Sequence, residues 1–230
     1  MLLISTSQLK YFRMKKLAIF DLDGTLLNTI YDLGGASNYA LRKMGFNQHP
    51  IPAYNFMVGN GVRKLLERAQ PDADSKTIDE LLSIFKEYYD QHCMDDTKTY
   101  TGIPELLQEL TERGVAIAVA SNKYQSAAER IVKHYFPDIP FVSIQGQQEG
   151  RPAKPDPSII FSVLADHPTP KSEVLYIGDS GVDMETARRA CVESIGVSWG
   201  FRPVSELREA HADNIVSTPS DIIKFLSDPF

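Results

Sequence analysis

The stretch LAIFDLDGTL at residues 17–26 determines how the rest of the chain is organised. Its four leading apolar residues, ended by an acid, are typical of a short strand that is buried on both faces. Asp21 then lies at the carboxyl tip of that strand, where open α/β sheets place their ligands, and Asp23 follows two residues later. At about 4 Å and an effective dielectric of about 20, two such carboxylates repel each other by roughly 4 kcal/mol. The pair therefore needs a cation, a shared proton or a chemical role.

Two ordinary explanations compete with a functional one. Aspartate and glycine after a strand are common turn residues. A calcium-binding EF-hand loop also begins D-x-D, but it needs glycine at its sixth position, where this chain has Leu26, and a helix in front, where this chain has a strand. Matching groups on later strands would decide in favour of a functional site.

The composition is that of an ordinary globular protein and disfavours several partners. The 230 residues, 43% apolar and 23% charged, are enough for one large domain or for a domain with a smaller companion. A formal net charge of −6 argues against nucleic acid or an anionic membrane as the main partner. No apolar run reaches the roughly 20 residues that a membrane span needs. Cys93 and Cys191 lie far apart, which favours reduced thiols and a cytoplasmic location.

Residues 1–13 do not have the pattern of a signal peptide, because no basic segment precedes their short apolar patch. Met14 leads directly into the first strand and would be a natural start, so we expect residues 1–13 to be a disordered extension. Between residues 29 and 100, apolar residues recur at helical spacing without a convincing strand. This segment is far longer than a normal βα connection, and it predicts a small helical domain inserted at 29–100. A bare helical extension of the core is the alternative.

The core is predicted to comprise residues 14–28 and 101–230. After residue 100, strands are expected at 115–120, 141–144, 174–177, 195–198 and 214–216, with helices between them. Such alternation predicts an α/β fold, a Rossmann-like open parallel sheet with right-handed crossovers.

Polar side chains follow the first, second and fourth of the expected strands, and Lys154 comes at an expected helix start on the same edge. The set comprises Asp21, Asp23, Ser121, Lys154, Asp179 and Asp183. Carboxylates, a hydroxyl and an ammonium gathered at this edge fit a site for Mg²⁺ and a phosphoryl group, because Mg²⁺ prefers hard oxygen ligands and substrate phosphate. Each residue taken alone could be a helix cap or a solvated surface residue. Their common placement at one edge of a sheet favours the functional interpretation.

Four short motifs resemble those of the haloacid dehalogenase (HAD) superfamily. They are DLDGT at 21–25, Ser121-Asn122-Lys123, Lys154-Pro155 and GDSGVD at 178–183. More narrowly, GNGVRKLLERA at 59–69 and IGVSWGF at 195–201 are similar to the phosphoglycolate phosphatase-like branch. The resemblance implies the HAD fold, with 29–100 as its helical cap domain. It also implies a Mg²⁺-dependent phosphatase that hydrolyses a small phosphorylated metabolite such as phosphoglycolate.

The resemblance further implies roles for the residues of these motifs. Asp21 is the nucleophile that forms an aspartyl-phosphate, and Asp23 is the general acid and base. Mg²⁺ is held by Asp21, the backbone carbonyl of Asp23 and Asp179, with Asp183 in support. Ser121 and Lys154 neutralise the oxygens of the transferring group. The expected substrate-binding residues are Leu22 and Asn122 through backbone N–H groups, Lys123, Gly61 in a glycine-rich cap loop, and Arg63 for a substrate carboxylate.

Several alternatives remain open at this point. A phosphomutase of the β-phosphoglucomutase type shares all four motifs, and a pyrophosphatase or nucleotidase of the same fold would share them too. A dehalogenase needs no general acid two residues after its nucleophile, so Asp23 argues against that chemistry. A non-enzymatic protein would be expected to carry damage in one of the motifs, and none is seen. The sequence leaves open whether the protein is a monomer or a homodimer.

Overall fold

A computed structural model of the chain describes residues 14–227, so the disordered extension expected at 1–13 lies outside the described residues. Its centre is a six-stranded sheet in which every neighbouring pair of strands is parallel, which confirms the predicted α/β architecture. In spatial order the strands are β5 (Phe141–Gln147), β4 (Ala116–Tyr124), β1 (Leu17–Phe20), β6 (Val174–Gly178), β7 (Glu193–Val197) and β8 (Asn214–Val216).

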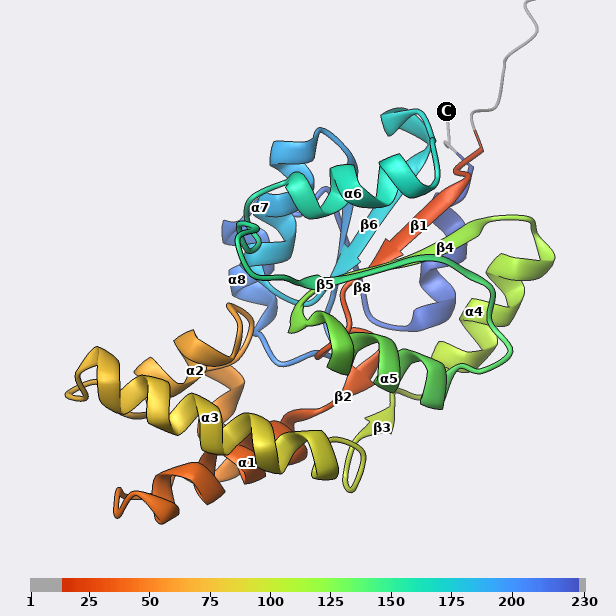
Figure 1. Ribbon diagram of the computed structural model, residues 1–230. Helices are drawn as coiled ribbons and strands as arrows, with labels where there is room; N and C mark the ends of the chain where they lie inside the picture. The colour runs from red at the N-terminus through yellow and green to blue at the C-terminus, as the bar shows by residue number, and fades with distance from the viewer. Residues whose placement is uncertain (1–13, 228–230) are drawn as a thin grey trace, which may run out of the picture.

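Strand β1 lies inside the sheet between β4 and β6, and all four of its residues are fully buried. Ala18 and Phe20 belong to the apolar cluster on one face, while Leu17 and Ile19 belong to the cluster on the other. Helices cover both faces (Figure 1), which explains why this strand is apolar throughout instead of alternating. These helices are α4 (Ile103–Glu112) and α5 (Gln125–Tyr135) on one face, and α6 (Ser158–Asp166) and α7 (Gly181–Ala190) on the other.

The remaining core elements are short and connect or close the sheet. They are η2 (Lys171–Glu173), α8 (Val204–Glu209) and η3 (Pro219–Phe225), where η denotes a 3₁₀ helix. From β1 the chain runs to β4 and β5 on one side, and then to β6, β7 and β8 on the other. The chain therefore adds strands first on one side of β1 and then on the other, which makes this position a topological switch point. Ligands of such sheets bind there, at the carboxyl ends of the strands.

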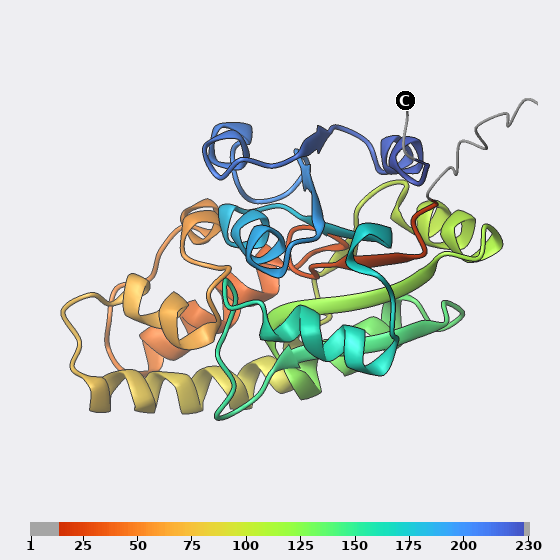
Figure 2. The same ribbon diagram turned by 90° about the horizontal axis from the view of Figure 1, so that it is seen from above.

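A helical insert lies beyond the carboxyl ends of the core strands (Figures 1 and 2). It contains α1 (Ile30–Lys43), η1 (Ile51–Phe56), α2 (Val62–Ala69) and α3 (Ser75–His92). Its helices pack against one another through buried apolar residues such as Leu33, Leu65 and Phe85. Asp74 caps α3 by accepting the N–H of Thr77 at 2.8 Å. Within residues 14–227, no helix combines the length and the apolar character that crossing a membrane demands.

The expectation that no strand occurs between residues 28 and 100 is wrong in one detail. The two connections between core and insert pair as a small antiparallel sheet of β2 (Leu27–Asn28) and β3 (Lys98–Thr99). Two residues are too few to show a period in the sequence, and their pairing partner lies about 70 residues away. This sheet holds the entry and the exit of the insert side by side.

Candidate active site

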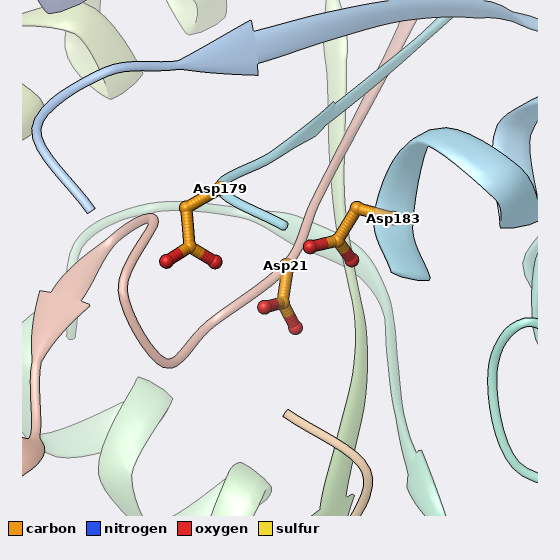
Figure 3. A group of neighbouring side chains, drawn as sticks. All are labelled: Asp21, Asp179 and Asp183. Atoms are coloured by element: carbon orange, nitrogen blue, oxygen red, sulfur yellow. The ribbon is translucent and has the colours of Figure 1, made fainter. Parts of the chain in front are cut away.

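Three carboxylates converge at the carboxyl edge of the sheet. Asp21 directly follows β1, Asp179 directly follows β6, and Asp183 lies in the first turn of α7. One carboxylate oxygen from each lies within 4.8 Å of the others, and Figure 3 shows the three side chains facing one another. The convergence predicted for these aspartates follows from β1 and β6 being parallel neighbours whose ends meet.

Lys154 is the cation of this cluster and is 3% exposed. Its Nζ donates to Asp21 Oδ1 at 2.8 Å, to Asp183 Oδ1 at 2.7 Å, and to the carbonyl of Ala120 and the hydroxyl of Tyr176 at 3.1 Å each. Lys154 lies in the loop that leads into α6, a helix that begins at Ser158. Tertiary contacts hold Lys154 in this loop, since its backbone N–H donates to the side chain of Asn122 at 2.8 Å.

Burial dominates the electrostatics of the cluster. It raises the pKa of the Asp21 carboxyl to about 6, where Lys154 opposes the rise and Asp183 adds to it. Burial also raises the pKa of Asp179 well above its usual range, with further contributions from Asp183 and Asp21. Desolvation disfavours the charged form of Lys154, but Asp183 and Asp21 outweigh it, so the pKa of Lys154 is raised. With one ammonium facing three carboxylates, the cluster has excess negative charge that favours a further cation.

Some carboxylate oxygens of the cluster accept hydrogen bonds, and others do not. Asp21 Oδ1 is held by Lys154, and Asp183 is held on both oxygens, by Lys154 and by the N–H and hydroxyl of Ser180 at 3.1 and 2.6 Å. Asp179 Oδ2 accepts the N–H of Phe201 at 2.7 Å. Within the described part of the chain, no donor hydrogen-bonds Asp21 Oδ2 or Asp179 Oδ1. Two buried hard oxygens left without donors fit Mg²⁺, with Asp183 holding Lys154 in place.

Asp23 is not part of the carboxylate cluster. Its side chain points instead to Lys123 Nζ, at 2.9 Å and 3.0 Å from the two oxygens, and Thr29 Oγ1 donates to its Oδ1 at 2.8 Å. Asp23 nevertheless lines the same pocket as Asp21, between the core and the helical insert. A carboxylate in this pocket that does not face the cation site can exchange a proton with a bound substrate or a water molecule.

The three residues of the second motif lie within β4, because this strand continues to Tyr124 instead of stopping at residue 120. Ser121, Asn122 and Lys123 all line the pocket. The side-chain amide of Asn122 donates to the carbonyl of Gly59 in the insert at 2.9 Å and to the carbonyl of Lys154 at 3.2 Å. Asn122 therefore connects the core, the lysine loop and the insert.

The turn after β1 and the glycine loop of the insert lie where the sequence analysis expects them. Leu22 is fully buried, and its carbonyl accepts the N–H of Leu26 and of Leu27 at 3.1 Å each, which closes the tight turn. Gly59 and Gly61 both line the pocket. Gly61 lies immediately before α2 and has a φ of 83°, a conformation that residues with side chains rarely adopt.

Comparison with known proteins identifies the family to which the chain belongs. Residues 18–197 match a family model described as haloacid dehalogenase-like hydrolase. This chain belongs to the haloacid dehalogenase-like hydrolase family. The hydrolase is 28% identical over 213 residues to the phosphoglycolate phosphatase of Aquifex aeolicus, with 93% of this chain and 97% of that protein covered. It is 32% identical over 207 residues to the phosphoglycolate phosphatase of Pseudomonas savastanoi pv. phaseolicola, with 84% and 74% covered.

Solved structures agree with these relatives. A crystal structure from Lactobacillus delbrueckii subsp. bulgaricus, of a protein provisionally described as a phosphoglycolate phosphatase, matches the hydrolase with a TM-score of 0.88 and 30% identity. The match covers 94% of this chain and all of that one. Family and relatives together identify the enzyme as a phosphatase.

Arg63 does not reach the pocket of the hydrolase. Its guanidinium forms an ion pair with Asp79 on the surface of the insert, and its side chain is 42% exposed. Arg202, in the segment after β7, lines the pocket instead, with a side chain that is 12% exposed. One of its Nη atoms donates to the carbonyl of Val58 in the insert at 2.9 Å. The arginine predicted to bind the substrate carboxylate belongs to the insert, whereas the arginine that lines the pocket comes from the core.

Several residues of the site carry no role in the sequence analysis. Tyr176, Tyr89 and Thr29 contact Lys154, Lys123 and Asp23 through their hydroxyls. Gly24 and Gly200 lie so close to Asp179 that a Cβ at either position would overlap its side chain. The WGF segment that contains Gly200 is a signal that could have located this contact, whereas a lone tyrosine in a buried strand or helix carries none. The residues that the sequence did not reveal support the site mainly by packing and hydrogen bonding.

Proposed function

We propose that this enzyme is a cytoplasmic, Mg²⁺-dependent phosphatase that hydrolyses a small phosphomonoester bearing a second anionic group, of the phosphoglycolate type. The observation that carries the proposal is a pair of carboxylate oxygens near the ammonium of Lys154, Asp21 Oδ2 and Asp179 Oδ1, that accept no hydrogen bond from residues 14–227. The named relatives support the substrate class, and the two free cysteines, Cys93 and Cys191, support a reducing compartment.

Covalent transfer to Asp21 is the first step of the proposed reaction. A carboxylate oxygen of Asp21 attacks phosphorus in line with the ester oxygen, forming the aspartyl-phosphate as the phosphorus–ester bond breaks. Asp23 gives its proton to the leaving alkoxide. Lys154 and the hydroxyl of Ser121 stabilise the charge on the phosphoryl oxygens, and the backbone N–H groups of Leu22 and Asn122 are assigned the same role.

Hydrolysis of the aspartyl-phosphate completes the reaction. Asp23, now a carboxylate, takes a proton from water, and the resulting hydroxide oxygen attacks phosphorus and releases Asp21 and inorganic phosphate. Mg²⁺ bound by Asp21, Asp179 and the carbonyl of Asp23 would supply positive charge that lets an anionic nucleophile approach a phosphate dianion. Asp183 supports the site by holding Lys154.

The helical insert is assigned as the cap of the enzyme, with core residues 14–28 and 101–230 and cap residues 29–100. Its position supports this division, because the pocket over Asp21 is closed on the far side by insert residues such as Val58, Val62 and Leu65. An apolar wall of this kind excludes water from the phosphoryl group and offers the substrate no charge. The charge that selects the substrate must therefore come from the core.

Phosphate release measured across a panel of phosphorylated metabolites tests the proposed substrate class. The panel contains 2-phosphoglycolate, pyrophosphate, nucleoside monophosphates and sugar 1-phosphates. We expect 2-phosphoglycolate to have the highest kcat/KM. A preference for pyrophosphate or nucleotides, or an isomerised sugar phosphate without release of phosphate, would overturn the proposal.

Removing the metal is expected to abolish activity and to lower stability. Chelation should stop phosphate release until Mg²⁺ is restored, and Mg²⁺ at about 100 times its Kd should raise the free energy of unfolding by roughly 2.7 kcal/mol. Asp179→Asn should lose most of this stabilisation, as measured by thermal unfolding with and without Mg²⁺. The matched control is Asp213→Asn, because Asp213 binds the N–H and hydroxyl of Ser194 outside the site. Equal stabilisation of both variants would contradict the assigned metal ligands.

Arg202 is the pocket cation with donors left for the second anionic group of the substrate. Its hydrogen bond to Val58 uses one donor, and its ion pair with Glu206 is long, at 3.8 Å. Arg202→Gln should raise KM for 2-phosphoglycolate about 10- to 100-fold, since hydrogen bonds between charged groups contribute about 1.5–3 kcal/mol. KM for a phosphomonoester without a carboxylate should change little.

Arg63→Gln is the matched control for this change, because it also removes an arginine but one that pairs with Asp79 at the surface. Steady-state kinetics of both variants on both substrates separate the two arginines. If Arg63→Gln raises KM for 2-phosphoglycolate and Arg202→Gln does not, the assignment to Arg202 is wrong.

A further inference from the structure

Lys123 is a buried ammonium that the reaction described above does not use. Its side chain is 2% exposed, and its Nζ contacts both carboxylate oxygens of Asp23 and the hydroxyl of Tyr89 at 2.8 Å. The same Nζ lies 4.9 Å from the centre of the Tyr89 ring, a cation–π distance. With these partners engaged, the ammonium has no spare hydrogen for a substrate, which argues against the substrate-binding role expected for it.

The three residues come from three different parts of the fold. Asp23 lies in the turn after β1, Lys123 near the end of β4, and Tyr89 in α3 of the helical insert. Lys123 therefore connects the general acid of the core to a helix of the insert. Thr29, immediately before α1, completes the set by donating to Asp23 Oδ1 at 2.8 Å.

The energetics make Asp23 dependent on the position of α3. An ammonium taken out of water needs its hydrogen-bond partners, because a lost partner costs the desolvation of the group left behind. If α3 moves away, Lys123 loses the hydroxyl and the ring of Tyr89 together. The ammonium then has only Asp23 as a partner and gains freedom to move, so the carboxylate that it contacts on both oxygens is held less firmly, with Thr29 as its other donor.

We propose that Tyr89 and Lys123 are positioning residues that orient the Asp23 carboxylate for proton transfer when the helical insert is seated on the core. The inference rests on the proposed function, in which Asp23 protonates the leaving group. The insert then does more than close the pocket, because its α3 completes the support of the general acid. Proton transfer requires the acid to lie within hydrogen-bond reach of the ester oxygen, so a small displacement of Asp23 reduces the rate.

The leaving group gives a test that a merely structural role would not pass. An alkoxide, as in 2-phosphoglycolate, needs a proton to depart, whereas the acetate of acetyl phosphate does not. Tyr89→Phe should lower kcat/KM for 2-phosphoglycolate about 10- to 100-fold, part of the 10²- to 10⁴-fold that general acid catalysis typically supplies. The loss should lie in kcat with little change in KM. For acetyl phosphate, kcat/KM should stay within about threefold of the wild type.

Tyr135→Phe is the matched control. The Tyr135 hydroxyl also joins the core to the insert, donating to the carbonyl of Thr97 at 2.8 Å, yet it contacts neither Asp23 nor Lys123. It should leave both substrates unaffected. Lys123→Met is a second variant and should show the same dependence on the leaving group, more strongly. Equal loss on both substrates, no loss, or a rise in KM alone for Tyr89→Phe would overturn the proposal.

Asp23→Asn in the same assay separates this inference from the proposed function. If Asp23→Asn depends on the leaving group and Tyr89→Phe does not, the positioning role fails while the general acid stands. If Asp23→Asn lowers kcat/KM equally for both substrates, or the wild type releases phosphate from neither, the proposed function itself fails. The quantity compared is kcat/KM, because Asp23 as general base also acts in the hydrolysis step that both substrates share.

Discussion

Replacing Asp21 with asparagine is expected to reduce the hydrolysis of 2-phosphoglycolate by on the order of 10⁴-fold or more, because removing a covalent nucleophile leaves only the residual catalysis of the site. The protein should remain folded. Asparagine has the same shape and can still accept a hydrogen bond from Lys154, which keeps its charge partner Asp183. Burial raises the pKa of Asp21 to about 6, so the fold disfavours its charged form and a neutral side chain should not lower the stability of the metal-free protein.

The measurement pairs steady-state phosphate release with thermal unfolding and with trapping of the phosphorylated protein. The wild type should become transiently labelled on residue 21, and Asp21→Asn should not. Asp32→Asn is a matched control, since Asp32 is equally buried but lies in the insert, where it accepts the N–H groups of Asp96 and Thr97 at 2.9 Å each. This control should lose stability and keep its turnover per folded molecule. Turnover like the wild type in Asp21→Asn would remove the basis of the proposed reaction.

Replacing Lys154 with methionine is expected to lower both activity and stability. Breaking a buried ion pair by removing one partner costs about 3–5 kcal/mol, because the remaining charge stays buried without compensation. Here Asp21 and Asp183 both lose their cation, and the carbonyl of Ala120 and the hydroxyl of Tyr176 lose a donor. Denaturant unfolding without Mg²⁺ measures the stability, and phosphate release at a temperature where the variant is folded measures the activity.

Lys15→Met is the matched control for this variant. Lys15 is 5% exposed and pairs with Glu193 at 2.6 Å, but it lies at the other end of β1, away from the pocket. Its loss should lower stability and leave turnover unchanged. Adding Asp183→Asn to Lys154→Met should recover part of the lost stability, since it removes a charge that no longer has a partner. Unchanged stability in Lys154→Met would contradict the account of the buried cluster.

Much of the core could be predicted because its signals are local. The apolar run that forms β1, ended by Asp21, shows a strand buried on both faces, and the later strands repeat that pattern. Parallel strands must bring their carboxyl ends to one edge, so the meeting of Asp21 with Asp179 follows from topology alone. The predictions about the core strands that failed concern segments whose sequence carries no local signal. Two-residue strands have no period, and the end of β4 carries no turn residue before Ser121-Asn122-Lys123.

The sequence by itself determined the sheet, the insert and the identity of the acids and the lysine at the site. Only the tertiary structure decided which side chains face the pocket. Arg63 is turned to the surface by Asp79, Arg202 lines the pocket, and Lys123 contacts Asp23 and Tyr89. The physical reason is that the position of a side chain across a domain contact depends on how two separately formed units pack together. No pattern within either unit records that packing.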